Sequence, residues 1–425
     1  MELSLLLRTT ICFVYLQYVF GVDWWGNYMD GLKDQISADG FQQFPEKSRS
    51  LDIYQEAFVC PDMSPSTQVP TRADRVKPAD VKVLAAMGDS LTAAIGANAT
   101  NVLEIPNEYR QFSWSIGGYS NYSELVTLPN IFKLFNPSVT GFAKGMTVSY
   151  RPAPLENAQL NMAVTGANTF TLPEQTRNLV DTMKTFPGIN MEEDWKVITI
   201  FIGSNDLCDY CKNTTLFSAD SFIYNLTVSL DILQKEMPRS IVNVVQLFPI
   251  EQLRDINDKS FGCILQKFFC SCVVNPKDNS SELLELIDQN IQFQEKLVQL
   301  IVTSGRYDGK KDFRVVLQPF LRNVTPALDH NGHIDYSFFT LDCFHLTIKG
   351  HEQLAKGLWN NMFQPYGEKV HLKTFSEPVQ LICPSKDHPY IYTRELSDDT
   401  NGSYLHKVSV LQYGLLLLFV LHLHW

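Results

Sequence analysis

The sequence predicts an α/β fold in which helices cover both faces of a parallel sheet. Two observations support this prediction: several short apolar segments have the character of buried strands, and amphipathic helical segments separate them. Strands that alternate with helices favour parallel pairing, because each helix returns the chain to the starting edge of the sheet. The expected strands are Val81–Met87, Met162–Thr165, Lys196–Ile202, Ile241–Phe248 and Phe313–Pro319.

The segments between the strands repeat apolar residues with the period of a helix. A further helix is expected to begin at Ser90, directly after the first strand. The regions 98–160 and 250–280 lack such a pattern and are expected to be irregular insertions. The expected long helices span 172–186, 218–237, 281–305 and 345–363.

Both ends of the chain are typical of targeting segments. Residues 1–21 combine Arg8 with a short apolar run, which predicts a secretory signal peptide, with a membrane anchor as the alternative. Residues 404–425 end in an apolar tail, which predicts a glycosylphosphatidylinositol (GPI) anchor signal or a single membrane helix. Between them we expect a lead-in over 22–80, the main α/β domain over 81–366 and a tail over 367–403.

The composition also indicates an exported globular protein. The 425 residues carry a formal net charge of −11 without a basic block, so nucleic-acid binding has no electrostatic support. Apart from Cys12 in the expected signal peptide, the cysteines are even in number, which favours disulfides without fixing their pairing. The spacing Cys208-x-x-Cys211 also fits a redox pair or half a metal site, but nothing else in the sequence supports a metal.

The sequence thus provides candidate positions for two covalent modifications, disulfide bonds and N-glycosylation. The disulfide candidates are Cys60, Cys208, Cys211, Cys263, Cys270, Cys272, Cys343 and Cys383. The acceptor sites for N-glycosylation are Asn98, Asn121, Asn213, Asn225, Asn279 and Asn323, with Asn401 close to the expected cleavage site for the anchor.

Ser90 stands at the turn between the first strand and the following helix, where α/β sheets present a nucleophile. A serine hydroxyl needs a base within hydrogen-bond reach, and His345 in the loop before the last helix is a suitable base. Asp342 precedes it by three residues and can orient the ring from the same loop. The alternative is structural, because Asp89, Ser90 and Asp342 are also residue types that cap helices.

Two more strand ends carry groups that can stabilise an oxyanion. Gly166 follows the second expected strand, and Asn205 follows the third. The backbone N–H groups of Ser90 and Gly166 and the side-chain amide of Asn205 are suitable donors. Each residue alone could belong to an ordinary turn. Together they favour one site, because the carboxyl ends of parallel strands meet at one edge of the sheet.

These residues resemble the four blocks of the SGNH (GDSL) hydrolase family. "GDSLTAA", "NMAVTGA", "IGSND" and "DCFH" are similar to its serine, glycine, asparagine and Asp-x-x-His blocks. Longer segments such as "DWKVITIFIGSNDLCDYC" and "DCFHLTIKGHEQLAKGLWNNM" resemble the membrane-associated phospholipase B group of that family, and the resemblance runs from about Phe58 to Tyr390. Members of that group often contain several tandem copies, whereas one copy is expected here.

The resemblance implies a flavodoxin-like three-layer α/β/α sandwich that needs no metal or other cofactor. It implies Ser90 as the nucleophile, His345 as the base, and Gly166 and Asn205 as oxyanion donors. The acid stays open, since the general family pattern implies Asp342 and the phospholipase B group implies Asp206. The short Asp-x-x-His loop favours Asp342, and Asp206 could instead orient Asn205 or the turn.

The resemblance further predicts a phospholipase A and lysophospholipase at the outer face of the plasma membrane, or a secreted one. Its partners would be phospholipids and lysophospholipids, and it would hold the membrane by a lipid anchor or a single helix. The alternatives are an acetylesterase acting on carbohydrate or short-chain esters and an inactive anchored binding glycoprotein. A flavodoxin-type cofactor is disfavoured, because "GDSLTAA" is a poor cradle for phosphate. Candidates for an acyl groove, or equally for core, are Phe112, Trp114, Tyr119, Tyr122, Ile131 and Phe135.

Overall fold

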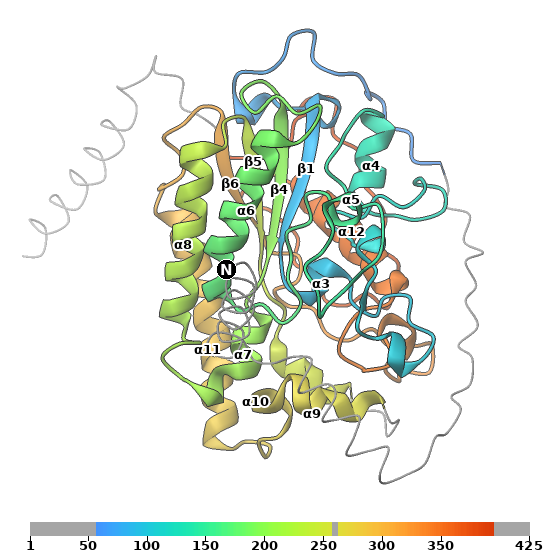
Figure 1. Ribbon diagram of the computed structural model, residues 1–425, viewed down its shortest axis with the longest axis vertical. Helices are drawn as coiled ribbons and strands as arrows, with labels where there is room; N and C mark the ends of the chain where they lie inside the picture. Colours follow the sequence, from blue (N-terminus) through green and yellow to red (C-terminus); the bar gives the residue numbers. More distant parts are fainter. Residues whose placement is uncertain (1–56, 257–261, 395–425) are drawn as a thin grey trace, which may run out of the picture. The chain divides into compact units, whose positions relative to one another are not determined.

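The computed structural model describes residues 57–256 and 262–394. The expected signal peptide, the tail over 404–425 and Asn401 lie outside the described residues. The main sheet has four parallel strands in the order β1-β4-β5-β6 (Figure 1). These strands are β1 (Val81–Gly88), β4 (Trp195–Phe201), β5 (Ser240–Val245) and β6 (Phe313–Gln318).

The free edge of β1 is covered by an irregular segment of the chain. Val83 forms a parallel bridge with Thr140, and Ala86 forms one with Asn161. Because this segment occupies the place of a second strand, the order along the sheet corresponds to the flavodoxin-like 2-1-3-4-5. The expected strand Met162–Thr165 is therefore wrong as a strand, although its residues run beside β1. The turn at Gly166, with φ 79°, ends the segment before a ladder can form.

Helices cover both faces of the sheet, as the sequence predicted. Figure 1 shows α6 (Leu172–Thr185), α8 (Ala219–Glu236) and α11 (Ser281–Leu297) on one side of it. On the other side lie α4 (Leu128–Phe135) and α12 (Ile348–Met362). The result is the expected three-layer α/β/α sandwich.

Burial explains why the strands read as continuous apolar runs. Every residue of β4 is buried, because helices exclude water from both faces of the sheet. The long helices begin at hydroxyl caps: the side chain of Ser218 accepts from Ser221 N–H, and that of Ser280 accepts from Leu283 N–H. The helix expected over 281–305 becomes a π-helix from Val298 to Thr303.

The insertions contain more structure than the sequence indicated. The helix α4 was not expected, although Thr127 caps it and Pro129 stands in its first turn. The expected helix after β1 is only one turn long, because Ala94 adopts a left-handed conformation. The remaining strands and α-helices are α3 (Ser90–Ala93), β2 (Asn107–Glu108), β3 (Thr147–Val148), α5 (Leu155–Ala158), α7 (Ser204–Asp209), α9 (Gln266–Phe269) and α10 (Ser271–Val274).

Segments on either side of 81–366 pack into the same compact unit, which ends at Thr393. The indole N–H of Trp195 donates to the carbonyl of Pro70 over 2.8 Å. Ile391 is fully buried, and its backbone N–H donates to Val76. The lead-in and the tail thus both contribute to the core around the sheet.

Candidate active site

A sharp turn at the end of β1 presents Ser90. A Cβ atom at Gly88 would lie 2.2 Å from the carbonyl oxygen of Phe201, so only glycine fits where β1 ends. Asp89 then caps α3 by accepting a hydrogen bond from Leu91 N–H over 2.9 Å. Since Asp89 supplies the cap, the side chain of Ser90 is available to another partner. Of the structural alternatives, capping therefore applies to Asp89 and not to Ser90.

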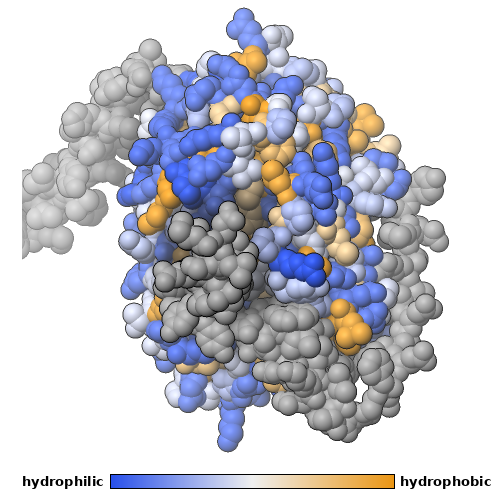
Figure 2. Space-filling view, in the orientation of Figure 1, coloured by the Kyte–Doolittle hydropathy of each residue, from blue (hydrophilic) through white to orange (hydrophobic). Residues whose placement is uncertain are grey.

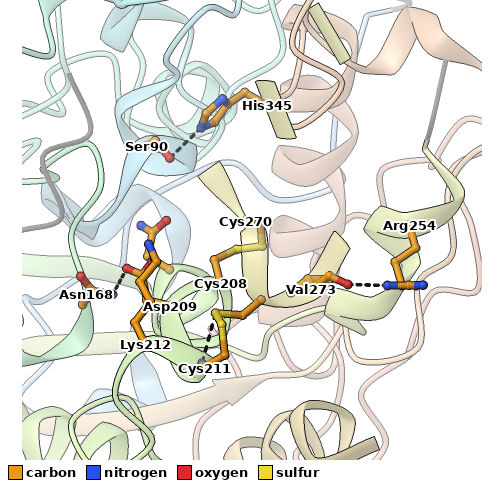
Figure 3. Close-up of a disulfide and its surroundings, with 12 residues drawn as sticks. Ser90, Asn168, Cys208, Asp209, Cys211, Lys212, Arg254, Cys270, Val273 and His345 are labelled. Atoms are coloured by element: carbon orange, nitrogen blue, oxygen red, sulfur yellow. Dashed lines mark hydrogen bonds and ion pairs between the residues drawn. A yellow bond between two sulfur atoms is a disulfide. The ribbon is translucent and has the colours of Figure 1, made fainter. Parts of the chain in front are cut away.

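The partner of Ser90 is His345, which reaches it from the loop before α12. The Ser90 Oγ atom lies 2.9 Å from His345 Nε2, and His345 Nδ1 lies 2.7 Å from Asp342 Oδ2 (Figure 3 shows the serine and the histidine). The three residues expose 4%, 1% and 0% of their surfaces. Hydroxyl, imidazole and carboxylate are therefore joined in series inside the protein.

The Asp342 carboxylate is held in its ionised form. Burial alone would raise its pKa, but the charge and hydrogen bonds of His345 and the hydroxyl of Thr340 outweigh burial and lower the pKa to about 2. Its Oδ1 atom also accepts from the backbone N–H groups of Phe344 and His345, each over 3.0 Å. An ionised carboxylate at Nδ1 keeps the proton on that nitrogen and leaves Nε2 to act as a base toward Ser90.

The loop that carries Gly166 and the first turn of α7, which carries Asn205, meet beside the end of β1. Val164 N–H donates to the carbonyl of Gly88 over 3.1 Å, which fixes the Gly166 loop against the strand that carries Ser90. The Asn205 side chain donates to the carbonyl of Ala167 over 2.9 Å, which joins the first turn of α7 to the loop of Gly166. Ser90 N–H stands in the first turn of α3, where backbone donors have no partner within the helix.

Asp206, the alternative acid, faces a different partner. Its Oδ2 atom accepts from the backbone N–H and the hydroxyl of Thr169, each over 2.9 Å. Burial raises the pKa of Asp206 to about 7, although both bonds to Thr169 oppose the rise. Of the two candidate acids, the structure brings Asp342 to His345 and uses Asp206 to join the segment after Gly166 to α7.

A buried ion pair that sequence reasoning missed braces the segment before Gly166. The Arg110 guanidinium lies 2.8 Å from Glu108 Oε2 and donates to the carbonyl oxygens of Asn161 and Ala163. The hydroxyl of Thr165, the residue before Gly166, donates to Glu108 Oε1 over 2.6 Å. Both charged side chains are 3% exposed. No local pattern in the sequence marks the role of this pair, because the carbonyl group of Asn161 that Arg110 binds lies about fifty residues away.

The cysteines pair as four disulfides, which supports the sequence prediction. The two cysteines of "CDYC" do not bond each other. Cys208 in α7 bonds Cys270, the residue before α10, and Cys211 in the 3-10 turn after α7 bonds Cys272 in α10 (Figure 3). One disulfide reaches the loop of the candidate site, because Cys343 follows Asp342. The pairs are Cys60–Cys383, Cys208–Cys270, Cys211–Cys272 and Cys263–Cys343.

The glycosylation candidates differ in accessibility. Asn225 is half-buried within α8, where its amide donates to the carbonyl of Ser221 over 2.9 Å. Asn98 is also half-buried. The four that are exposed are Asn121, Asn213, Asn279 and Asn323.

The part of the chain that the structure describes holds neither a metal cluster nor a membrane-spanning helix. Over 57–256 and 262–394, no group of three or more His, Cys, Asp or Glu side chains is placed to hold a metal ion. Within the same ranges, no helix has the length and apolar character needed to cross a membrane.

A serine, an imidazole and a carboxylate joined in series at the carboxyl edge of a flavodoxin-like sheet define the class of serine hydrolases. The chain belongs to the GDSL-like lipase/acylhydrolase family, whose model matches residues 84–358. This membership confirms the family resemblance seen in the sequence.

Known relatives are similar over most of this chain. "Phospholipase B1, membrane-associated" of Homo sapiens is 45% identical over 361 residues, which cover 84% of this chain and 24% of that protein. The protein of the same name from Rattus norvegicus is 43% identical, covering 81% of this chain and 24% of its own length. The chain thus spans about a quarter of the length of these curated relatives.

Among solved structures, the chain is similar to an acetyl esterase mutant crystallised with an acetate ion. The two are 12% identical with a TM-score of 0.27, over 65% of this chain and 93% of that chain. The likeness is too distant to carry an argument.

Proposed function

We propose that this protein hydrolyses the acyl esters of glycerophospholipids and lysophospholipids through an acyl-serine intermediate. The observation that carries the proposal is the series Ser90–His345–Asp342, with 2.9 Å and 2.7 Å between the bonded atoms. The names of the relatives support the lipid substrate, since proteins over 40% identical along this domain are phospholipases B.

The reaction takes two displacements at one carbonyl carbon. Ser90 Oγ attacks the acyl carbon while His345 Nε2 takes the hydroxyl proton, and Asp342 stabilises the imidazolium that forms. Oxyanion stabilisation is assigned to the backbone N–H groups of Ser90 and Gly166 and to the amide of Asn205. The C–O bond of the ester then breaks, and the leaving alcohol takes the proton from His345. Water repeats the sequence on the acyl-serine and releases the fatty acid.

The same proposal places the protein outside the cell, at the plasma membrane or secreted from it. Four disulfides and the exposed glycosylation candidates support exposure to an oxidising exterior. The sequence of residues 404–425 supports attachment by a GPI anchor or a single membrane helix. Release of the protein from intact cells by a phospholipase C that cleaves GPI anchors would distinguish the two modes.

The test is fatty-acid release from phosphatidylcholine and lysophosphatidylcholine by the full chain beside Ser90→Ala. The proposal predicts release by the wild type and a loss of about 1,000-fold or more in the variant. Hydrolysis of acetyl esters alone by the wild type would assign the protein to the acetylesterase alternative. The absence of any ester hydrolysis would favour the binding glycoprotein.

A further inference from the structure

An apolar cavity of about 100 Å³ lies between the sheet and the amino-terminal half of α12. Its walls come from the segments after β4, β5 and β6, from the loop that carries His345 and from α12. Of its lining residues, only Ser204, Gln252 and Thr325 have polar side chains. Thr325 is exposed, so this part of the wall reaches the surface.

The cavity adjoins the candidate active site along three separate segments. Leu91, which follows Ser90, lines it. So do Phe344 and Leu346, on either side of His345. Ser204, which precedes Asn205, forms part of the same wall. The segments that bring together nucleophile, base and oxyanion donor therefore also enclose this apolar space.

We propose that the cavity binds the hydrocarbon chain of the acyl group and thereby sets the chain length that the enzyme prefers. The inference rests on the proposed ester hydrolysis and adds the site of the fatty chain. When Ser90 forms its bond to the acyl carbon, the chain attached to that carbon enters the space beside Leu91 and Phe344. The alcohol part of the ester leaves away from the cavity, and no other reactant is needed.

The apolar character of the cavity supports a hydrocarbon over an acetyl group or a sugar. A polar ligand would leave its hydroxyl groups without partners against this wall, at a high cost in free energy. A methylene chain gains from leaving water for such a space. On the face shown in Figure 2, hydrophilic residues dominate and hydrophobic ones stand in small groups.

The aromatic residues that the sequence offered for an acyl groove do not line this cavity. Trp114 and Ile131 are fully buried in the core, and Tyr122 and Phe135 pack there as well. Tyr119 is 48% exposed and forms an edge contact with Phe112 instead. The lining of the proposed acyl site thus comes from Leu91 and from residues after 200, and not from the region 98–160.

The test compares p-nitrophenyl esters from acetate to palmitate with the full-length protein. Each methylene that enters the cavity should raise kcat/KM about fourfold until the cavity is full. The gain should then stop at a defined chain length. A flat profile from acetate onward would overturn the proposal while leaving the serine mechanism intact.

Two variants shift that length in opposite directions. Val324→Phe narrows the cavity at a half-buried position and should lower the ratio of octanoyl to acetyl hydrolysis by about tenfold or more. Phe375→Ala widens it and should move the best substrate to a longer chain. The control Val69→Phe makes the same change at a position that is 62% exposed and outside the lining, and should leave the profile unchanged.

The outcomes separate this inference from the proposed function. The cavity does not hold the chain if Val324→Phe lowers kcat/KM for all esters by the same factor and Phe375→Ala leaves the preferred chain length unchanged. If the wild type cleaves no ester, the proposed function fails, and displacement of a fluorescent fatty acid from the protein then tests the cavity alone. Fatty-acid binding weakened by Val324→Phe, and unchanged in Val69→Phe, would support the acyl site; equal binding in all three would overturn it.

Discussion

The Nδ1 atom of His345 lies 2.7 Å from Oδ2 of Asp342, which stands three residues earlier in the same loop. A loop this short delivers base and acid as one unit and needs no second segment to align them. The carboxylate of the other candidate acid, Asp206, accepts hydrogen bonds from the backbone N–H and the hydroxyl of Thr169. The two acids therefore make separate contacts: Asp342 holds His345, and Asp206 joins α7 to the segment after Gly166.

Replacement of each acid by asparagine separates these tasks. Asp342→Asn should lower kcat by about 1,000-fold or more, because it disturbs the tautomer of His345. Asp206→Asn should cost less, in the range of roughly 100–1,000-fold that follows loss of an oxyanion donor. The low-field proton resonance of the His345 Nδ1–H should vanish in Asp342→Asn and persist in Asp206→Asn. The reverse pattern would identify Asp206 as the acid.

Stability should depend on pH through Asp206. Its pKa is about 7 in the folded protein against an ordinary 3.8, so the folded state keeps a proton that the unfolded chain releases between these values. The free energy of unfolding of the wild type should therefore fall, relative to that of Asp206→Asn, as the pH rises from about 4 to about 7, by at most about 1.4 kcal/mol per pH unit. Urea denaturation of both proteins across this range measures the difference. If the free energies of unfolding of the two proteins changed equally with pH, the raised pKa of Asp206 would be contradicted.

Removal of Arg110 should affect both stability and turnover. Arg110→Gln leaves Glu108 buried without its counter-charge, which should cost about 3–5 kcal/mol of folding free energy. The double variant Arg110→Gln, Glu108→Gln should recover much of that stability. It should not recover kcat, because the carbonyl oxygens of Asn161 and Ala163 still lack their donor. Recovery of kcat together with stability would show that the pair acts only on the fold.

The disulfide between Cys263 and Cys343 should matter for turnover more than for stability. Its removal by Cys263→Ser, Cys343→Ser frees the residue next to Asp342, so kcat should fall even where the protein stays folded. The matched control removes Cys60–Cys383, which closes 323 residues rather than 80. The control should lose at least as much stability, since longer loops gain more from closure, and should keep its kcat. Thermal unfolding measures the effect of each variant on stability, and steady-state kinetics measures its effect on kcat.

Much of the framework was predictable from local pattern. The strands β1, β4, β5 and β6 are buried on both faces, and such strands appear as apolar runs that end at turn residues. Ser90, Asp342 and His345 were predictable because a strand end and a short loop place them by local chain geometry alone. The family resemblance then supplied the three-layer arrangement.

Other features could not be predicted because distant residues decide them. The segment after Asn161 resembles a strand, yet its hydrogen bonds go to Arg110 and to one edge of β1, and Gly166 ends it. The pairing of Cys208 and Cys211 with residues about sixty positions away depends on where α10 packs. The apolar cavity is formed where segments after three strands meet the loop of His345 and α12, and each of these segments resembles ordinary core on its own.

Covalent labelling with an alkyl fluorophosphonate tests whether Ser90 is the nucleophile, because this reagent reacts with an activated serine. We expect a single labelled peptide containing "GDSLTAA", with the phosphonate on Ser90, and no label in Ser90→Ala. Asp342→Asn should react more slowly at the same position. Ester hydrolysis by a wild-type protein whose label falls on another residue, or that takes no label at all, would contradict the account.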